Sequence, residues 1–225
     1  DNFLLVEEGR MREQETVALL SSGRYPVRNA HQNIADLRAQ VAANEKGVQE
    51  LRRMVEHFGL DVVRAYMRHV QDNAEASVRR VLGVLKDGAF EYPLDNGAVI
   101  RVRIRIAADR RGASIDFTGT SAQLPNNFNA PKAVAMAAVL YVFRTLVDDE
   151  IPLNAGCLKP LEVIVPEGCM LNPRYPAAVV AGNVETSQCI TDCLYGALGV
   201  LAASQGTMNN FTFGNDLYQY YATIA

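Results

Sequence analysis

Residues 101–106 read Arg-Val-Arg-Ile-Arg-Ile, and this alternation of charged and apolar side chains decides how the fold is organised. A period of two predicts a half-buried β-strand with its apolar side chains facing a core. An Asp-Asn-Gly turn at 95–97 precedes the strand, and a turn at 109–112 leads to a returning strand at 114–117. The arginine face has two interpretations: a solvated outer face, which is the more common one, or a site for an anion or an acidic partner.

Upstream of this strand, apolar or small side chains recur at alternating spacings of four and three, the pattern of a heptad seam. One run covers 37–58, a second covers 63–85, and Gly59 lies between them as a helix stop. The two runs predict an antiparallel helical hairpin with a very short turn. Asn44 and Ser77 place polar side chains in the seam, so we expect the hairpin to pack against other protein.

Downstream, the segment 131–147 is rich in alanine and predicts a buried helix. We expect a strand at 161–165, a second buried helix at 184–203 and a strand at 217–224. Helices followed by strands and then by mixed elements predict an α+β fold: a helical hairpin, a β-hairpin, and a mixed sheet with buried helices.

We divide the chain into an N-terminal segment, 1–88, with the helical hairpin at about 36–86, and an α+β core, 89–225. The chain begins with Asp1 rather than Met, and we interpret it as a piece of a larger subunit.

Charge and composition exclude several classes of function. The 225 residues carry 22 Lys and Arg against 25 Asp and Glu, a net charge of -3, whereas a general nucleic-acid-binding protein is basic. The apolar runs are shorter than the roughly 20 residues that a membrane span needs. We therefore expect no nucleic acid and no membrane. The four cysteines are interpreted as reduced thiols of a cytoplasmic protein, and no metal site is predicted within the chain.

The sequence also excludes common catalytic motifs. The three histidines lie at 31, 57 and 69, far from the polar second half of the chain. The sequence contains no Gly-x-Ser-x-Gly elbow and no Gly-Lys pair, so neither a serine hydrolase elbow nor a phosphate-binding Walker loop is predicted.

Four polar segments remain, at 116–121, 126–131, 181–188 and 204–211. Two of them lead into predicted buried helices, whose first turns offer free N–H groups to anions or carbonyl oxygens. The segments either cap their own helices or together frame a ligand, and the spacing alone leaves both interpretations open. The substrate-binding candidates are Thr118, Thr120, Asn129, Asn183, Thr186, Gln188, Asn209 and Asn210.

Glu185 and Asp116 are the candidate catalytic carboxylates. Asn183 is placed to cap the second buried helix, which puts Glu185 in its first turn. In one interpretation Glu185 only compensates the helix dipole, worth about 0.3–1 kcal/mol. In the other it acts as an acid/base or orienting group in a pocket, where burial raises a carboxyl pKa to useful values.

The chain resembles the hydantoinase B/oxoprolinase family across nearly its whole length. The matching segments are 28–40 (RNAHQNIADLRAQ), 116–123 (DFTGTSAQ), 151–156 (IPLNAG), 179–188 (VVAGNVETSQ), 203–214 (ASQGTMNNFTFG) and the ending at 220–224. The resemblance implies a cytosolic B-type subunit that works with a hydantoinase A-type partner, which uses ATP to activate an amide or ketone carbonyl. We therefore expect a hetero-oligomer, a small-molecule substrate, and ATP on the partner rather than on this chain.

The resemblance leaves two classes of function. One is part of an ATP-dependent amidohydrolase of the 5-oxoprolinase or hydantoinase type, inactive as an isolated fragment. The other is a structural or interface segment of a complex like acetone or acetophenone carboxylase, with no chemistry of its own. The family's upstream segments, which look like a divalent-metal site, have no counterpart here, so no metal ligand is assigned. The substrate stays open among 5-oxoproline, a hydantoin and a ketone.

Overall fold

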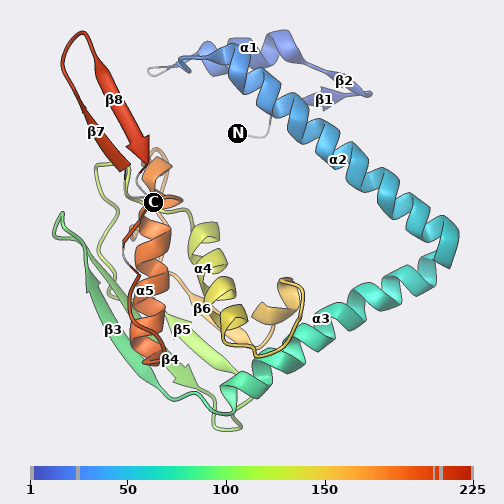
Figure 1. Ribbon diagram of the computed structural model, residues 1–225, viewed down its shortest axis with the longest axis vertical. Coiled ribbons are helices and arrows are strands. Elements are labelled where there is room, and N and C mark those ends of the chain that lie inside the picture. The colour runs from blue at the N-terminus through green and yellow to red at the C-terminus, as the bar shows by residue number, and fades with distance from the viewer. Residues whose placement is uncertain (1–2, 24–25, 205, 208–209, 224–225) are drawn as a thin grey trace. The chain divides into compact units, whose positions relative to one another are not determined.

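The computed structural model describes residues 3–23, 26–204, 206–207 and 210–223 (Figure 1). The chain forms two compact units, 1–66 and 67–225. The boundary lies within a helix, earlier than the division at residue 88 that the sequence indicated. The elements confirm the α+β class.

The first unit is mainly helical. It holds a two-stranded hairpin, β1 (Val6–Glu7) and β2 (Arg10–Met11), followed by α1 (Glu13–Ser21) and α2 (Ala30–Phe58). The Asn29 side chain caps α2 by accepting a hydrogen bond from the Gln32 backbone N–H at 3.2 Å. Arg38 of α2 pairs with Glu13 of α1, and the two helices pack together. A side-chain cap and an ion pair between the two helices therefore help to hold this unit.

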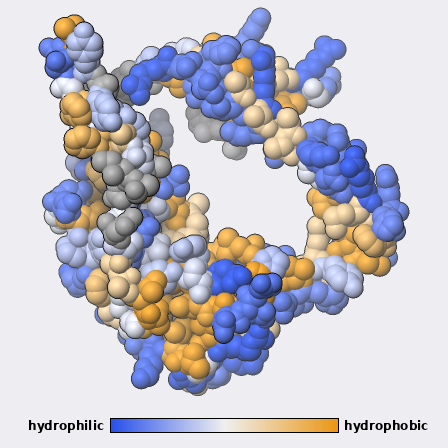
Figure 2. All heavy atoms as spheres, in the orientation of Figure 1, coloured by the Kyte–Doolittle hydropathy of each residue, from blue (hydrophilic) through white to orange (hydrophobic). Residues whose placement is uncertain are grey.

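The two predicted long helices are present, as α2 and α3 (Leu60–Leu82), with Gly59 between them at a φ of +83°. Their seam is exposed over much of its length: Val48 is 42% exposed, Phe58 56% and Met67 48%. Apolar surface is visible near the point where α2 gives way to α3 (Figure 2). The hairpin packing of this seam stays a prediction.

The second unit is built around one four-stranded sheet in the order β3-β4-β5-β6. The strands are β3 (Gly88–Pro93), β4 (Val99–Ile106), β5 (Ala113–Asp116) and β6 (Leu161–Ile164). β3, β4 and β5 pair antiparallel, and β6 pairs parallel to β5. The alternation that predicted β4 is confirmed, since Ile100, Val102 and Ile104 are at most 3% exposed.

Two helices cover the inner face of this sheet. α5 (Thr186–Leu198) packs on β3 and β4, and α4 (Lys132–Thr145) packs on α5 (Figure 1). Gly88 allows the close approach, because a Cβ built there would lie 1.8 Å from the carbonyl oxygen of Ala197. Both helices lie within the predicted ranges 131–147 and 184–203. The remaining elements of this unit are the 3-10 helices η1 (Ala155–Leu158) and η2 (Val180–Gly182) and the strands β7 (Asn210–Gly214) and β8 (Gln219–Thr223).

β7 and β8 pair as an antiparallel hairpin. β8 lies within the predicted strand at 217–224, of which Ile224 is outside the described residues. β7 was not predicted as a strand.

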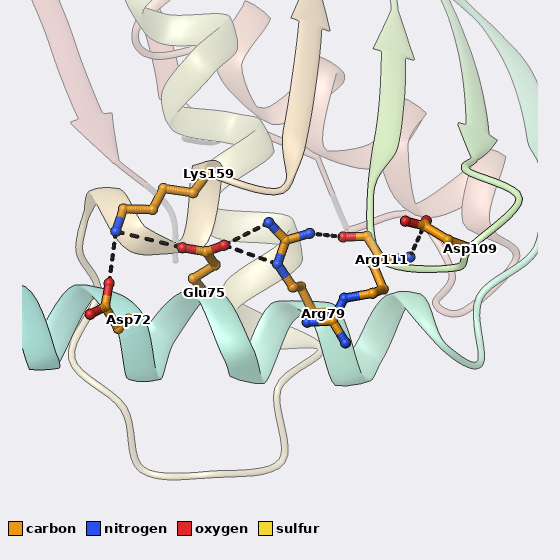
Figure 3. Close-up of polar contacts among 6 residues, drawn as sticks. All are labelled: Asp72, Glu75, Arg79, Asp109, Arg111 and Lys159. Carbon is orange, nitrogen blue, oxygen red and sulfur yellow. Dashed lines mark hydrogen bonds and ion pairs between the residues drawn. The ribbon is translucent and has the colours of Figure 1, made fainter.

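The second half of α3 is anchored to this unit by burial and by charge. Ala74, Val78 and Leu82 are fully buried in the core. Lys159 Nζ lies 3.1 Å from Asp72 Oδ1 and 3.5 Å from Glu75 Oε2. Glu75 also pairs with Arg79 at 2.6 Å, and Arg79 donates to the carbonyl oxygen of Arg111 (Figure 3).

Candidate functional site

Five of the ten predicted site residues line three separate cavities of the second unit. We call the first the α5 cavity. It has a volume of about 430 Å³ and lies beside the beginning of α5. It is lined by Tyr92, Pro93, Leu94, Asp95, Asn96, Phe128, Glu185, Cys189, Gly206 and Thr207. The other two places, described below, hold Asp116 and Asn183.

Glu185 is half-buried in the α5 cavity and occupies the N-cap position of α5. The Thr207 hydroxyl donates a hydrogen bond to Oε2 of Glu185, so the carboxylate is held in one orientation. The expectation that Asn183 caps α5 is wrong. Asn183 ends η2 instead, and α5 begins one residue after Glu185, at Thr186. The helix therefore starts later than the sequence indicated, because η2 occupies the preceding turn.

Tyr92 and Cys189 add two weak acids to the α5 cavity. Burial raises the pKa of the Tyr92 hydroxyl and the pKa of the Cys189 thiol, and each of these two groups also affects the pKa of the other. Both groups are therefore protonated at neutral pH. The α5 cavity thus combines two carboxylates, Glu185 and Asp95, with the Thr207 hydroxyl, one neutral phenol and one neutral thiol.

Asp116, the second predicted carboxylate, lies elsewhere, at the end of β5. It lines a cavity of about 410 Å³ on the outer face of the sheet, with Thr118, Arg101 and Arg103 among its neighbours. Its Oδ1 accepts a hydrogen bond from the Thr118 N–H at 2.8 Å. The Thr118 side chain, and then the nearby Arg103 and Arg105, lower the pKa of the Asp116 carboxyl. Glu185 and Asp116 line different cavities, so the structure does not bring the two carboxylates together.

Asn183 and Gln188 line a third place, a groove of about 400 Å³ between α4 and α5. The Asn183 carbonyl oxygen accepts from Ser187 Oγ at 2.9 Å. Gln188 Nε2 donates to Asp192 Oδ1 at 3.0 Å. Both residues therefore flank the beginning of α5, on a different cavity from the one that Glu185 lines.

Three of the predicted binding residues are buried and bonded to the backbone. Thr120 Oγ1 accepts from the Arg101 N–H and lies 3.1 Å from the Arg101 carbonyl oxygen. Asn129 is fully buried, and its amide joins the 124–126 loop to the Ala178 carbonyl oxygen. Thr186 Oγ1 donates to the Phe128 carbonyl oxygen at 2.6 Å. These contacts give the three side chains a role in joining neighbouring segments of the chain.

The last two predicted binding residues are Asn209 and Asn210. Asn210 begins β7, where it pairs with Thr223, and Asn209 lies outside the described residues.

The sequence analysis missed Tyr92, Cys189 and Thr207 as members of one cavity. Cys189 had a usable signal, since it follows Glu185 by four residues and so shares a helix face with it. Tyr92 lies on β3, distant in sequence, and only the packing of α5 on the sheet brings it to Glu185.

Across the described residues, no three side chains among His, Cys, Asp and Glu gather closely enough to hold a metal ion. Within the same part of the chain, no helix is both long and apolar enough to span a membrane.

Comparison with known proteins matches residues 1–225 to a family model described as Hydantoinase B/oxoprolinase. The chain is 43% identical to 5-oxoprolinase 1 of Arabidopsis thaliana, over 99% of this chain and 19% of that protein. It therefore spans about a fifth of this relative's length.

Two solved structures share the fold. The ATP-dependent caprolactamase of Pseudomonas jessenii matches 97% of this chain and 40% of its own, with a TM-score of 0.71 and 22% identity. A nucleotide-free acetone carboxylase matches 86% of this chain and 28% of its own, with a TM-score of 0.65 and 14% identity.

Proposed function

The chain belongs to the hydantoinase B/oxoprolinase family, and we propose that it forms part of the B-type subunit of an ATP-dependent amidohydrolase that opens a cyclic amide. The observation that carries this proposal is the oriented, half-buried Glu185 carboxylate in the α5 cavity. The name of the Arabidopsis relative, 5-oxoprolinase 1, supports a lactam as the substrate class.

The chemistry of ring opening suits a carboxylate in such a cavity. Water adds to the activated carbonyl carbon, the ring C–N bond breaks, and the departing nitrogen takes a proton. A carboxyl group within hydrogen-bonding reach can accept the proton that water loses and deliver one to the nitrogen. Glu185 would do this, while the Thr207 hydroxyl keeps the carboxylate in position.

Activation of the carbonyl is assigned to a hydantoinase A-type partner that binds ATP, in a cytoplasmic hetero-oligomer. This division of labour agrees with the sequence, which contains no Gly-Lys phosphate-binding pair.

The experiment that tests the proposal is Glu185→Gln in the complete two-subunit enzyme, assayed with ATP and 5-oxoproline, a hydantoin or another lactam. Loss of a positioned acid/base group reduces turnover by roughly 10²–10⁴-fold. We expect a loss in this range with an unchanged melting temperature.

Glu167→Gln is the matched control, because Glu167 is exposed and pairs with Arg174 on the surface, at 3.1 Å. It should leave turnover unchanged. Near wild-type turnover in Glu185→Gln would reduce Glu185 to a helix-end residue and contradict the proposed site.

A structural role in a complex that resembles acetone or acetophenone carboxylase is the second candidate. The observation in its favour is that the side chains of Thr120, Asn129 and Thr186 form hydrogen bonds with the chain's own backbone. Under this alternative, Glu185→Gln would leave turnover of every substrate class intact. Interface variants alone would then change activity, through loss of the complex.

A further inference from the structure

Asp192 is the only buried charged residue among the residues that the structure describes, with 4% of its surface exposed. A buried carboxylate is costly unless hydrogen-bond donors surround it. Asp192 lies in the middle of α5, two turns after Glu185, and the mechanism proposed above does not use it. The groups that bond to Asp192 therefore indicate which part of the structure the buried carboxylate stabilises.

Three donors converge on the Asp192 carboxylate. Oδ1 accepts from Gln188 Nε2 at 3.0 Å and from the Ser204 backbone N–H at 3.1 Å. Oδ2 accepts from Ser204 Oγ at 3.2 Å. A carboxylate accepts at both oxygens, whereas an asparagine amide would present a donor to one of these groups. The carboxylate therefore accepts from all three donors with no change at Ser204, whereas an asparagine would require the Ser204 hydroxyl to accept.

Ser204 connects this carboxylate to the chain that reaches the α5 cavity. Its Oγ accepts from the Gly206 N–H at 3.2 Å, and the next residue, Thr207, donates to Glu185. Gly206 and Thr207 both line the α5 cavity. After α5 ends, the chain therefore comes back to the helix at two positions. Ser204 bonds to Asp192, and Thr207 bonds to Glu185.

The spacing on α5 places both bonded carboxylates on the same side of the helix. Residues seven apart in an α-helix lie on one face, two turns from each other. Glu185 and Asp192 have this spacing, and Cys189 lies between them. Ser204 and Thr207 are therefore bonded to two positions on one helix face, two turns apart.

We propose that Asp192 is a positioning residue: it fixes Ser204 and Thr207 against α5 and thereby sets the orientation of the Glu185 carboxylate. This inference rests on the proposed function of Glu185. Asp192 itself touches no substrate, and it acts only through the chain from Ser204 to Thr207.

The test uses Asp192→Asn in the complete two-subunit enzyme, with kcat and KM measured separately and hydrogen exchange followed at residues 199–207. Misplacing a catalytic group by about 1 Å can cost on the order of 10²-fold in rate. We expect kcat to fall by about 10–100-fold, KM to change less than about threefold, and the Ser204 amide to lose protection. Ser204→Ala removes one of the three donors and gives a milder variant, should Asp192→Asn fold poorly.

A double-mutant comparison separates positioning from general destabilisation. If Asp192 acts through Thr207, then Asp192→Asn combined with Thr207→Val should be no slower than the slower single variant. Thr145→Val is the control. It removes the 2.7 Å hydrogen bond between Thr145 and Tyr195 of α5, which takes no part in the bonds from Asp192 to Glu185, and should lower stability without lowering kcat.

The outcomes are distinguishable. Full kcat in Asp192→Asn, beside an inactive Glu185→Gln, would overturn the positioning role and leave the proposed function standing. Losses of kcat that multiply in the double variant would also overturn it. Full turnover in Glu185→Gln would overturn the proposed function and the positioning role together.

Discussion

Helices α2 and α5 differ in what holds them. α2 runs for 29 residues with Ile34 as its only buried residue, whereas α5 runs for 13 residues and buries eight of them. α2 is stabilised by local interactions, including the Asn29 cap and an i,i+4 ion pair between Lys46 and Glu50 at 2.6 Å. α5 has no side-chain cap, and its support is the sheet and α4.

This difference shows where a polar residue acquires a specific environment. Most side chains on α2 meet water, their own helix or the neighbouring α1, so spacing describes much of their surroundings. A side chain on α5 meets groups from β3, from the 124–131 loop and from the 204–207 segment. Local sequence predicts the first kind of environment and not the second.

Leu194→Ala should have the largest effect on stability. Leu194 is fully buried on α5, and truncating such a residue costs about 2–5 kcal/mol, because it removes buried surface and leaves a cavity. Urea unfolding of the chain measures this cost. A loss below about 1 kcal/mol would show that α5 is not the packed helix described above.

Asn129→Ala should have the next largest effect. The variant orphans the Leu124 N–H and three carbonyl oxygens, and an unsatisfied buried polar group costs about 1–3 kcal/mol. The same unfolding measurement detects this loss. Unchanged stability with weakened substrate binding would instead restore the binding role that the sequence predicted.

Cys193 should make the free energy of unfolding depend on pH in the alkaline range. Burial raises the pKa of its thiol from 9.0 to about 12, so above pH 9 the unfolded chain loses a proton that the folded chain keeps. Stability contributed by this group is complete below pH 9 and falls as the pH rises toward 12, by up to about 1.4 kcal/mol per pH unit.

Comparison of wild type with Cys193→Ala at pH 8 and pH 10 isolates this contribution. The wild type should lose about 1 kcal/mol more than the variant over this interval. Equal losses in both proteins would place the Cys193 thiol in contact with solvent.

Leu51→Ala on α2 should have the smallest effect, within about 0.5 kcal/mol, because Leu51 is 44% exposed and alanine favours helices. Circular dichroism during urea unfolding measures the change. A cost of 2 kcal/mol or more would mean that a partner covers the seam, which is what the predicted helical pairing requires. This variant therefore also tests that prediction.

Much of the fold follows from spacing in the sequence. The alternation at 101–106 predicts β4 and its buried face, since a strand's side chains alternate whatever the strand pairs with. The apolar segments that became α4 and α5, and the heptad runs around Gly59, were predicted as helices for the same local reason. Motif segments spread along the chain were enough to indicate the family.

The candidate site was decided by tertiary structure. Sequence identified Glu185, but it paired this residue with Asp116, and the sheet places Asp116 in another cavity. The sequence indicated Asn129 as a binding residue. In the structure the Asn129 amide is buried and forms hydrogen bonds that join two loops. Tyr92 and Thr207 reach Glu185 from distant parts of the chain. A periodic pattern records which face of an element is buried, whereas a polar residue's role depends on the partners that packing brings to it.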